Sequence, residues 1–496
     1  MRTSEYLRLA QPFSRRAFLQ RSALAAAAAA MPSSLLTACG SDGGGVAGQP
    51  LTADPNIAWW LQNNYAPIDD EIEAFNLPVR GAIPPELNGL YVRNGSNPQT
   101  HESPHWFLGD GMVHGIRIEG GRAVSYRNRY VRTPFWEAGV SLDGAIDAGL
   151  PPGGGNSQSN VSCVYHAGKL LTSGEIGFAY QLDPNDLSTI GVHDFDGRLN
   201  TSFTAHPKID PATGFMHFFG YWLVEPYLTY HVADAGGAIV HSQVIEVAGP
   251  TMIHSFAITE SDVVFWEFPV VFDFARAIDS VIDAFSWQPE YGARIGVMPL
   301  GGNADQIRWV EVEPQFVFHE VNAYRDGDEV IVDVARHPEM FNGDDLGQSD
   351  TSVRRWYINT AGEHLTFRDE IVTERGFELP SHDRRLSGRR HRYGWFVNSR
   401  DNDQTVDLGG IARVDFQSGG IQEWEPGITN HCGEAFFVPA GPGEGEGWLF
   451  TFVHDHHSDR SRLAILDAQN IRRGPIAEIE LPRRVPYGFH AVWIPA

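Results

Sequence analysis

The chain has 496 residues, of which 37 are Lys or Arg and 62 are Asp or Glu, so its formal net charge is −25. Such acidity argues against binding to nucleic acid, which requires basic patches, and against electrostatic docking onto anionic lipid. The chain has 3 cysteines, too few for a disulfide scaffold or a Cys-based zinc site. The sequence alone does not decide whether Cys163 and Cys432 form a disulfide bond.

Residues 1–38 are predicted to be a twin-arginine export signal. Arg15 and Arg16 form the arginine pair, and a weakly apolar, Ala-rich stretch at 23–30 follows. That stretch falls well short of the ~20 apolar residues of a membrane-spanning helix, which argues against a transmembrane anchor. The twin-arginine route carries proteins that fold before crossing, often with a cofactor bound. We therefore expect a location at the periplasmic face of a bacterial membrane.

The signal is followed by Cys39, and the motif Leu36-Thr37-Ala38-Cys39 resembles a bacterial lipobox. Cleavage before Cys39 would leave a lipidated N-terminal cysteine, and several acyl chains would hold the protein on a membrane stably. The alternative is ordinary signal-peptidase cleavage nearby, which would leave Cys39 free. Residues 39–55 are Gly-rich and are predicted to form a flexible tether.

The predicted mature chain is more acidic than the precursor. The first 38 residues contain five Arg and one Glu, which leaves 32 basic and 61 acidic residues, a net charge of −29. Any membrane contact must therefore be apolar or run through the lipid anchor.

Residues 56–496 are predicted to be one all-β domain. Short β-like runs alternate with turns, and the chain has 52 Gly and 31 Pro. In chain order the clearest runs are GLYVRNG, HFFGYWLV, DVVFWEFPVVF, DEVIVDVAR, GWLFTFVHD and RLAILDA. At this length such strands favour a propeller, although no blade repeat is legible. The clearest helical pattern is FDFARAIDSVIDAF at 272–285, which could cap the mouth of a substrate cavity or be an ordinary packed helix.

Two segments near the C-terminus imitate functional motifs. GPGEGEG at 441–447 lacks the Lys and Ser/Thr of a phosphate loop and is predicted to be a hairpin turn. His454, His456 and His457 in VHDHHSDR are predicted to lie in a solvated loop rather than in a metal site.

Four other histidines each lie beside a short apolar or aromatic run: His206, His254, His319 and His490. They are separated by 48, 65 and 171 residues, so no single helix or hairpin could bring them together. A lone His in such a setting is more often a packed core residue. If the four converge in a large closed fold, they form a metal site, because a neutral imidazole offers a lone pair near pH 7.

The sequence motifs around these histidines resemble those of the carotenoid cleavage oxygenase family, over essentially the whole chain from residue 60. In chain order they are LNGLYVRNGSNP, WFLGDGMVHGIRI, NRYVRT, AHPKIDPATG, MIHSFAITE, ARIGVMP, FHEVNA, GRRHRYGW and GFHAVW. The family includes carotenoid and apocarotenoid dioxygenases, stilbene-cleaving enzymes and a retinoid isomerase. His114 and His391 lie in motifs that resemble those of the family but are not among its metal ligands, so we expect structural roles for them.

The resemblance implies a seven-bladed β-propeller with Fe(II) on the central axis and a few capping helices and loops. The implied iron ligands are His206, His254, His319 and His490. The resemblance also implies three carboxylates that accept hydrogen bonds from the ligand imidazoles: Glu175, Glu378 and Glu434. The match at Glu175 is looser than at the other two.

The implied activity is that of an Fe(II) dioxygenase that uses O2 to cleave a carbon–carbon double bond of a carotenoid or apocarotenoid into two carbonyl products. The substrate would lie in an apolar, aromatic-lined tunnel. No side chain beyond the metal centre is needed as acid or base, because the metal and O2 carry the chemistry. Whether a dioxetane or an epoxide forms first stays open.

Two alternatives remain. Stilbene-cleaving relatives carry a Lys in the segment that here reads NRYVRT, where this chain has Arg132. Because Arg almost never releases its proton, it is no simple substitute for Lys, and we prefer a carotenoid-type substrate. The other alternative is a propeller that binds an apolar ligand without turnover, which the complete set of His and Glu residues argues against.

Overall fold

The computed structural model describes residues 54–278, 281–342, 351–400 and 407–496. They belong to one compact unit, Gly48–Ala496. The predicted export signal, Cys39 and the tether as far as residue 53 lie outside the described residues, so those predictions stay untested.

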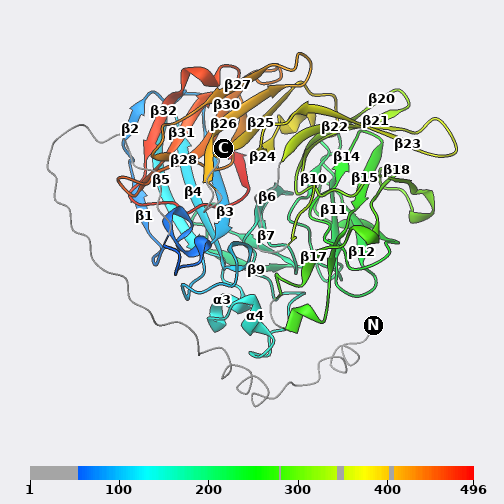
Figure 1. The fold of residues 1–496 in the computed structure, drawn as a ribbon. Helices are drawn as coiled ribbons and strands as arrows, with labels where there is room; N and C mark the ends of the chain where they lie inside the picture. Colours follow the sequence, from blue (N-terminus) through cyan, green and yellow to red (C-terminus); the bar gives the residue numbers. More distant parts are fainter. Residues whose placement is uncertain (1–53, 279–280, 343–350, 401–406) are drawn as a thin grey trace, which may run out of the picture. The chain divides into compact units, whose positions relative to one another are not determined.

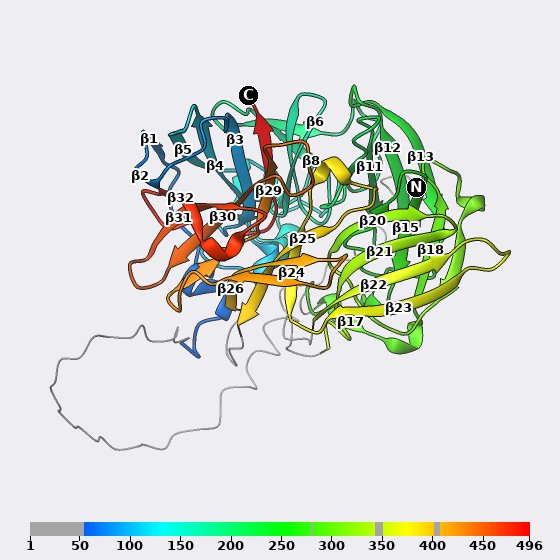
Figure 2. The same cartoon turned by 90° about the horizontal axis from the view of Figure 1, so that it is seen from above.

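Seven antiparallel sheets of four to six strands follow one another around a ring in the part of the chain that the structure describes (Figures 1 and 2). The sequence colours pass around this ring and return, so that the red C-terminal strands lie beside the blue N-terminal ones. This arrangement is a seven-bladed β-propeller, and the predicted fold is confirmed.

The first four blades follow the order of the chain except for one strand from the C-terminus. The first blade contains β1 (Glu73–Phe75), β5 (Arg122–Tyr130), β4 (Gly111–Glu119), β3 (Gly89–Ser96) and β33 (Ala491–Pro495). The second contains β6 (Ser162–His166), β7 (Lys169–Ser173), β8 (Ala179–Leu182) and β9 (Thr189–His193). The third contains β10 (Lys208–Ile209), β11 (Met216–Tyr221), β12 (Leu228–Ala233) and β13 (Ile239–Ile245). The fourth contains β14 (Ala257–Ile258), β15 (Asp262–Glu267), β18 (Arg294–Pro299) and β19 (Arg308–Glu311).

The remaining blades complete the ring. The fifth contains β20 (Glu320–Asp326), β21 (Glu329–Arg336), β22 (Ser352–Asn359) and β23 (Thr366–Thr373). The sixth contains β24 (Phe377–Ser381), β25 (Tyr393–Arg400), β26 (Asp407–Asp415) and β27 (Ile421–Trp424). The seventh contains β2 (Val79–Gly81), β32 (Pro475–Glu480), β31 (Arg460–Asp467), β30 (Gly447–Asp455), β28 (Asn430–Cys432) and β29 (Phe436–Pro439).

The ring is closed by strands from both ends of the described chain. The C-terminal strand β33 pairs with β3 in the first blade, with Arg93 opposite Ala491. The N-terminal strand β2 pairs with β32 in the seventh blade, with Val79 opposite Ile479. These pairings place the residue before β33, His490, at the centre of the ring.

Glycine-rich turns and aromatic packing explain the local structure. Gly120 and Gly121 join β4 to β5 with φ values of 55° and 75°, the left-handed conformation that a two-residue hairpin turn requires. Between the fourth and fifth blades the buried rings of Trp266 and Trp356 meet edge to face with centroids 5.8 Å apart. The blades are therefore held together by large apolar side chains on their facing surfaces.

Helices are short. Within the described ranges the structure has two α-helices, α3 (Pro134–Ala138) and α4 (Leu142–Ala145). The N-cap residue Thr133 accepts a hydrogen bond from the Trp136 amide, and Gly139 ends α3 in the left-handed conformation. The 3-10 turns are η1 (Trp59–Leu61), η2 (Asn63–Tyr65), η3 (Trp106–Leu108), η4 (Arg276–Ile278), η5 (Pro289–Tyr291), η6 (Ala304–Gln306), η7 (Arg384–Leu386) and η8 (Ile471–Arg473). No helix that the structure describes is long and apolar enough to cross a membrane.

The prediction of a helix at 272–285 is wrong for the residues of this range that the structure describes. They form β16 (Val270–Phe272), the single turn η4 and the start of β17 (Phe285–Trp287), and the two strands pair with Phe272 opposite Phe285. The rings of Phe272 and Phe285 pack with centroids 5.1 Å apart, and Ile282 is buried. Tertiary packing thus uses these apolar residues in a hairpin, although their spacing suits a helix equally well.

The other local predictions have mixed outcomes. The predicted hairpin turn is confirmed, because residues 440–446 join β29 to β30 and Gly447 is the first residue of β30. His454 is misassigned, because it lies in β30, is 3% exposed and has its Nε2 3.1 Å from an oxygen of Asp459. His457 is exposed in the loop that follows.

The structure also shows the contacts of His114 and His391 and whether Cys163 and Cys432 form a disulfide bond. His114 is buried with its Nδ1 2.9 Å from the Tyr126 hydroxyl, and buried His391 lies 3.1 Å from an oxygen of Asp333. Cys163 and Cys432 are both buried, and no disulfide bond joins them.

Candidate metal centre

The four predicted metal-binding histidines lie just before the edge strands that face the centre of the ring. His206 precedes β10, His254 precedes β14, His319 precedes β20 and His490 precedes β33. The propeller therefore brings together side chains that the chain separates by 48, 65 and 171 residues.

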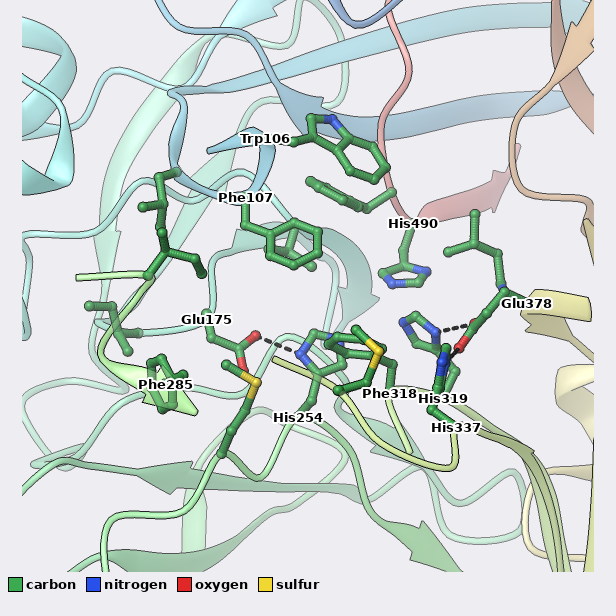
Figure 3. A pocket seen from close by; sticks show the side chains of 18 of the residues that line it. Trp106, Phe107, Glu175, His254, Phe285, Phe318, His319, His337, Glu378 and His490 are labelled. Atoms are coloured by element: carbon green, nitrogen blue, oxygen red, sulfur yellow. Dashed lines mark hydrogen bonds and ion pairs between the residues drawn. The ribbon is translucent and has the colours of Figure 1, made fainter. Parts of the chain in front are cut away.

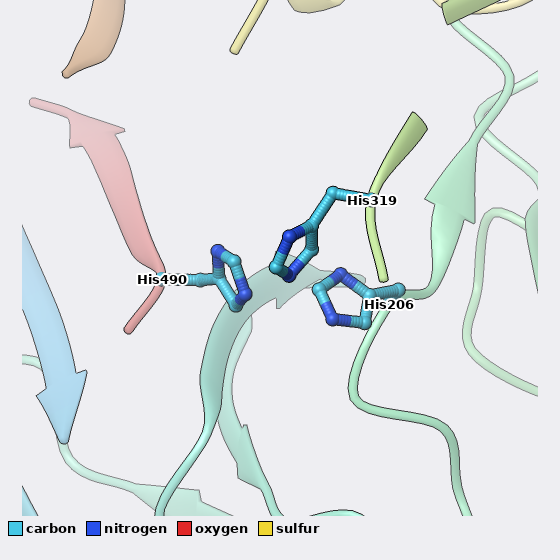
Figure 4. A group of neighbouring side chains, drawn as sticks. All are labelled: His206, His319 and His490. Carbon is cyan, nitrogen blue, oxygen red and sulfur yellow. The ribbon is translucent and has the colours of Figure 1, made fainter. Parts of the chain in front are cut away.

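The imidazoles lie in mutual contact. Ring centroids are 4.5 Å apart for His206 and His254, 4.5 Å for His206 and His490, and 5.0 Å for His319 and His490. The Nε2 atoms of His206 and His254 are 2.8 Å apart. One nitrogen from each of His206, His319 and His490 lies within 4.8 Å of the other two, and Figure 4 shows these rings gathered around one point.

The three predicted carboxylates each contact a different imidazole. The Glu175 carboxylate lies 2.9 Å from His254 Nδ1 and the Glu378 carboxylate 2.7 Å from His319 Nδ1, as the dashed lines in Figure 3 mark. The Glu434 carboxylate lies 2.9 Å from His490 Nδ1. These contacts turn the Nε2 atoms of the three rings toward the common centre.

The second oxygen of each carboxylate is held by a further donor. The Tyr221 hydroxyl donates to Glu175 over 2.9 Å, and the Ala491 amide donates to Glu434 over 2.9 Å. His337 Nε2 lies 2.8 Å from the remaining oxygen of Glu378. Sequence reasoning missed Tyr221 and His337, and the only signal was that Tyr221 lies within one β-like run and His337 follows another.

Burial favours the neutral form of two of the imidazoles, His206 and His319. It lowers the pKa of His206 well below the usual imidazole value, and the nearby His254 ring adds to the effect. Burial also lowers the pKa of His319, although Glu378 opposes the shift. For Glu378, burial by itself would raise the pKa, but the charges and hydrogen bonds of His319 and His337 outweigh it and lower that pKa. For His206, His319 and Glu378 these shifts favour neutral imidazoles and an ionised carboxylate, the protonation states that metal ligation needs.

The cluster fits a divalent transition metal. His319 Nε2 is buried without a hydrogen-bond partner, which is costly unless something else occupies its lone pair. An all-imidazole set oriented by carboxylates suits iron, zinc, copper or nickel better than magnesium or calcium. His206 differs from the other three, because no carboxylate among the described residues accepts a hydrogen bond from it.

An apolar cavity of about 240 Å³ reaches the imidazoles from one side. Its walls include Trp106, Phe107, Phe285, Phe318 and Phe489, and Figure 3 shows the first four of these around the histidines. The described residues that line it include no Lys or Arg. Its walls therefore suit an apolar or aromatic ligand.

A second cavity of about 490 Å³ shares only His319 and His490 with the first and also touches His206. Lys208 and Glu320 form a largely buried ion pair in its wall, and Ser255 donates to Glu320 over 2.5 Å. The imidazoles thus separate an apolar cavity from a charged one.

Arg132 does not line either cavity. Its guanidinium lies 2.6 Å from Glu71 and stacks over the Trp136 ring at 3.6 Å from the centroid. This charge is therefore already paired and does not face a ligand at the histidine cluster.

The comparisons with known proteins agree with this geometry. The profile of the family described as retinal pigment epithelial membrane protein (RPE65) matches residues 65–495. A carotenoid cleavage oxygenase of Mycobacterium tuberculosis is 34% identical over 88% of this chain and 97% of its own length. An isoeugenol monooxygenase of Pseudomonas nitroreducens is 30% identical over 88% of this chain and 98% of its own.

Solved structures show the same fold. A Pseudomonas brassicacearum lignostilbene dioxygenase superimposes with a TM-score of 0.82 at 27% identity, covering 88% of this chain and 99% of that one. A cobalt-substituted Synechocystis ACO superimposes with a TM-score of 0.77 at 26% identity, covering 88% of this chain and 98% of that one. The chain therefore belongs to the carotenoid cleavage oxygenase (RPE65) family and is an oxidoreductase of that family.

Proposed function

We propose that this protein is a non-haem Fe(II) dioxygenase that cleaves a carbon–carbon double bond of a carotenoid or apocarotenoid into two carbonyl products. The observation that carries this proposal is the cluster of four imidazoles, backed by three carboxylates, at the inner end of an aromatic-lined cavity. One alkene and one O2 give two carbonyl groups, so the reaction balances without an external reductant.

In this proposal His206, His254, His319 and His490 bind Fe(II), while Glu175, Glu378 and Glu434 orient the rings. When bound, Fe(II) supplies the activation of O2. The protein's own contribution is to hold the double bond beside the imidazoles and to exclude water with the aromatic walls. That a cobalt-substituted form of the similar Synechocystis protein exists supports a divalent metal at such a site.

The cavity chemistry favours a polyene. Phe107, Phe318 and Phe489 offer apolar faces and edges against which a conjugated chain packs. A phenolate would have no Lys or Arg to neutralise it among the described lining residues. The proposed substrate is therefore carotenoid-like rather than phenolic.

A stilbene or related phenylpropene is the second candidate. It is favoured by the structural similarity to a lignostilbene dioxygenase and the sequence similarity to an isoeugenol monooxygenase. Binding of an apolar ligand without turnover is the third, and measured iron content together with O2 uptake separates it from the two enzymatic candidates.

The test is incubation of the ferrous-loaded protein with carotenoids, apocarotenals and hydroxystilbenes, followed by mass analysis of the products. We expect aldehydes or ketones from the polyenes, one O2 consumed per cleavage, and no turnover after iron removal. Cleavage of hydroxystilbenes alone would transfer the assignment to the second candidate.

We also propose export by the twin-arginine route and a lipid anchor at Cys39 on the periplasmic face of a bacterial membrane. The support is the sequence of residues 1–55 alone: the Arg15–Arg16 pair, the Ala-rich stretch, the lipobox-like word and the Gly-rich tether. An anchored enzyme would lie next to polyenes that partition into the membrane.

A further inference from the structure

Gln158 lies in a polar segment that forms one wall of the apolar cavity. The segment joins the second blade to η3, because Asn160 Nδ2 donates to the carbonyl oxygens of Phe107 over 2.8 Å and Gly109 over 2.7 Å. Gln158 is 4% exposed and lines the cavity that ends at the histidines.

The neighbours of Gln158 all have hydrogen-bond partners. Ser157 Oγ accepts from the Ser159 amide over 3.1 Å, Ser159 Oγ lies 2.8 Å from Thr172 Oγ1, and Asn160 holds the η3 carbonyls. By contrast, the side-chain amide nitrogen of Gln158 is buried and has no hydrogen-bond partner among the described residues. Gln158, whose amide nitrogen has no hydrogen-bond partner among the described residues, therefore lines the cavity.

The backbone holds this arrangement in place at a cost. Ser159, the next residue, has a φ of 50°, a left-handed conformation that residues other than glycine rarely adopt. Gln158 itself is fixed by its carbonyl oxygen, which accepts from the Gly111 amide over 3.0 Å. A strained backbone thus presents a side-chain amide nitrogen that has no hydrogen-bond partner among the described residues.

We propose that Gln158 is a specificity-determining residue that hydrogen-bonds an oxygen atom on the substrate. An amide side chain offers both donors and an acceptor, so it matches a carbonyl or, better, a hydroxyl group, whichever way it is turned. A site built to hydrogen-bond such a group rejects the analogue that lacks it. The substrate class is therefore an oxygenated polyene, such as a hydroxylated carotenoid or an apocarotenal, and not a pure hydrocarbon. This inference rests on the proposed function.

The test compares Gln158→Met, a near-isosteric change that removes the amide, with the unmodified protein. The probes are β-carotene, its dihydroxylated counterpart zeaxanthin and β-apo-8′-carotenal, each delivered from detergent micelles. Binding is followed by quenching of tryptophan fluorescence, since Trp106 lines the cavity, and cleavage by product analysis. The matched control is Gln243→Met, because Gln243 lies in β13 and does not line the cavity.

We expect the unmodified protein and Gln243→Met to prefer at least one oxygenated probe over β-carotene by roughly tenfold, the equivalent of one hydrogen bond. Gln158→Met should lose that preference while binding β-carotene as before. Equal binding of all probes by the unmodified protein, or an unchanged preference in Gln158→Met, would show that an ordered water alone satisfies the amide and would overturn the inference.

The binding measurement keeps this inference separate from the proposed function. If the unmodified protein cleaves none of the probes but Gln158 still sets the binding preference, the proposed activity fails and the recognition role stands. If Gln158→Met does not fold, Gln158→Leu takes its place, with the same expected loss of preference.

Discussion

At the scale of single residues, the division of labour between the two nitrogens of each imidazole defines the centre. His254, His319 and His490 each turn Nδ1 to a carboxylate, which leaves Nε2 for the common point. A carboxylate that accepts from the far nitrogen fixes the tautomer and orientation of a ligand ring and raises its basicity. The three Glu residues therefore matter through the histidines that they orient.

Replacing His206, His254, His319 or His490 singly with Ala should remove most bound iron and all detectable cleavage. Each change deletes one of four nitrogen donors, and the remaining three cannot restore the same site. Iron content per protein and O2 uptake measure the effect. The control is His457→Ala, which removes an exposed histidine of the 456–459 loop and should retain iron and activity. An iron-replete, active variant at any of the four positions would remove that residue from the site.

Glu434→Gln should keep the fold and weaken iron retention or turnover by ~10–100-fold, the usual cost of losing a carboxylate behind a ligand histidine. The same result is expected for Glu175→Gln and Glu378→Gln, because each carboxylate contacts one imidazole. Iron affinity from competition with a chelator, together with circular dichroism, separates loss of metal from loss of fold. Unchanged affinity and kinetics in one variant would show that its carboxylate does not orient a ligand.

His337→Leu should weaken iron binding more than His337→Gln does. His337 Nε2 lies 2.8 Å from Glu378, which in turn contacts His319, so His337 acts as a positioning residue. Gln can keep a hydrogen bond to the carboxylate, whereas Leu leaves one oxygen of a buried carboxylate without its partner. The absorption spectrum of the Co2+-loaded variants reports the ligand geometry directly. Identical spectra and affinities for both variants would contradict the role.

At the scale of elements, the β16–β17 hairpin matters because it places side chains in the wall of the apolar cavity. Phe272, Val281, Ile282 and Phe285 all line that cavity. The segment therefore lines the apolar cavity as a hairpin and not as a helix, and its role in capping a substrate site stays a prediction.

Phe285→Ala should raise KM for the substrate and lower the free energy of unfolding by less than the ~3–5 kcal/mol lost when a fully buried Phe is truncated, because Phe285 is only partly buried. The removed ring leaves part of the cavity wall open to water. Steady-state kinetics and thermal unfolding measure the two effects. Phe274→Ala is the matched control, since Phe274 is 54% exposed and does not line the cavity. Equal effects in both variants would show that the hairpin does not contact the substrate.

At the scale of the whole molecule, closure of the ring creates the site. His490 reaches the centre only because β33, from the end of the chain, pairs with β3 near its beginning. The histidine cluster therefore depends on closure of the whole propeller.

Replacing Arg15 and Arg16 with Lys should leave the precursor in the cytoplasm, and Cys39→Ala should shift the exported protein away from the membrane fraction. The expectation rests on acyl chains as the main anchor, because the predicted mature chain has a net charge of −29. Cell fractionation and the intact mass of the mature N-terminus provide the measurements. A wild-type N-terminus without acyl mass would refute the lipid anchor, and Cys39→Ala protein that stays membrane-bound would mean that the folded domain itself contacts the membrane.

The sequence by itself was enough to predict the propeller, its family and the seven residues that gather at the centre. Those histidines and glutamates lie in short sequence motifs whose order along the chain is distinctive. Glycine turns and β-like runs are local patterns, so they predict strands and hairpins without knowledge of distant contacts. The tertiary structure alone decided what depends on contacts between distant residues. It paired Phe272 with Phe285 in a hairpin, buried His454, left Cys163 and Cys432 without a disulfide bond, and placed Tyr221, His337 and Gln158 beside the site. The physical reason is that a residue's neighbours along the chain set its local conformation, whereas its partners across the ring set its burial, its hydrogen bonds and therefore its role.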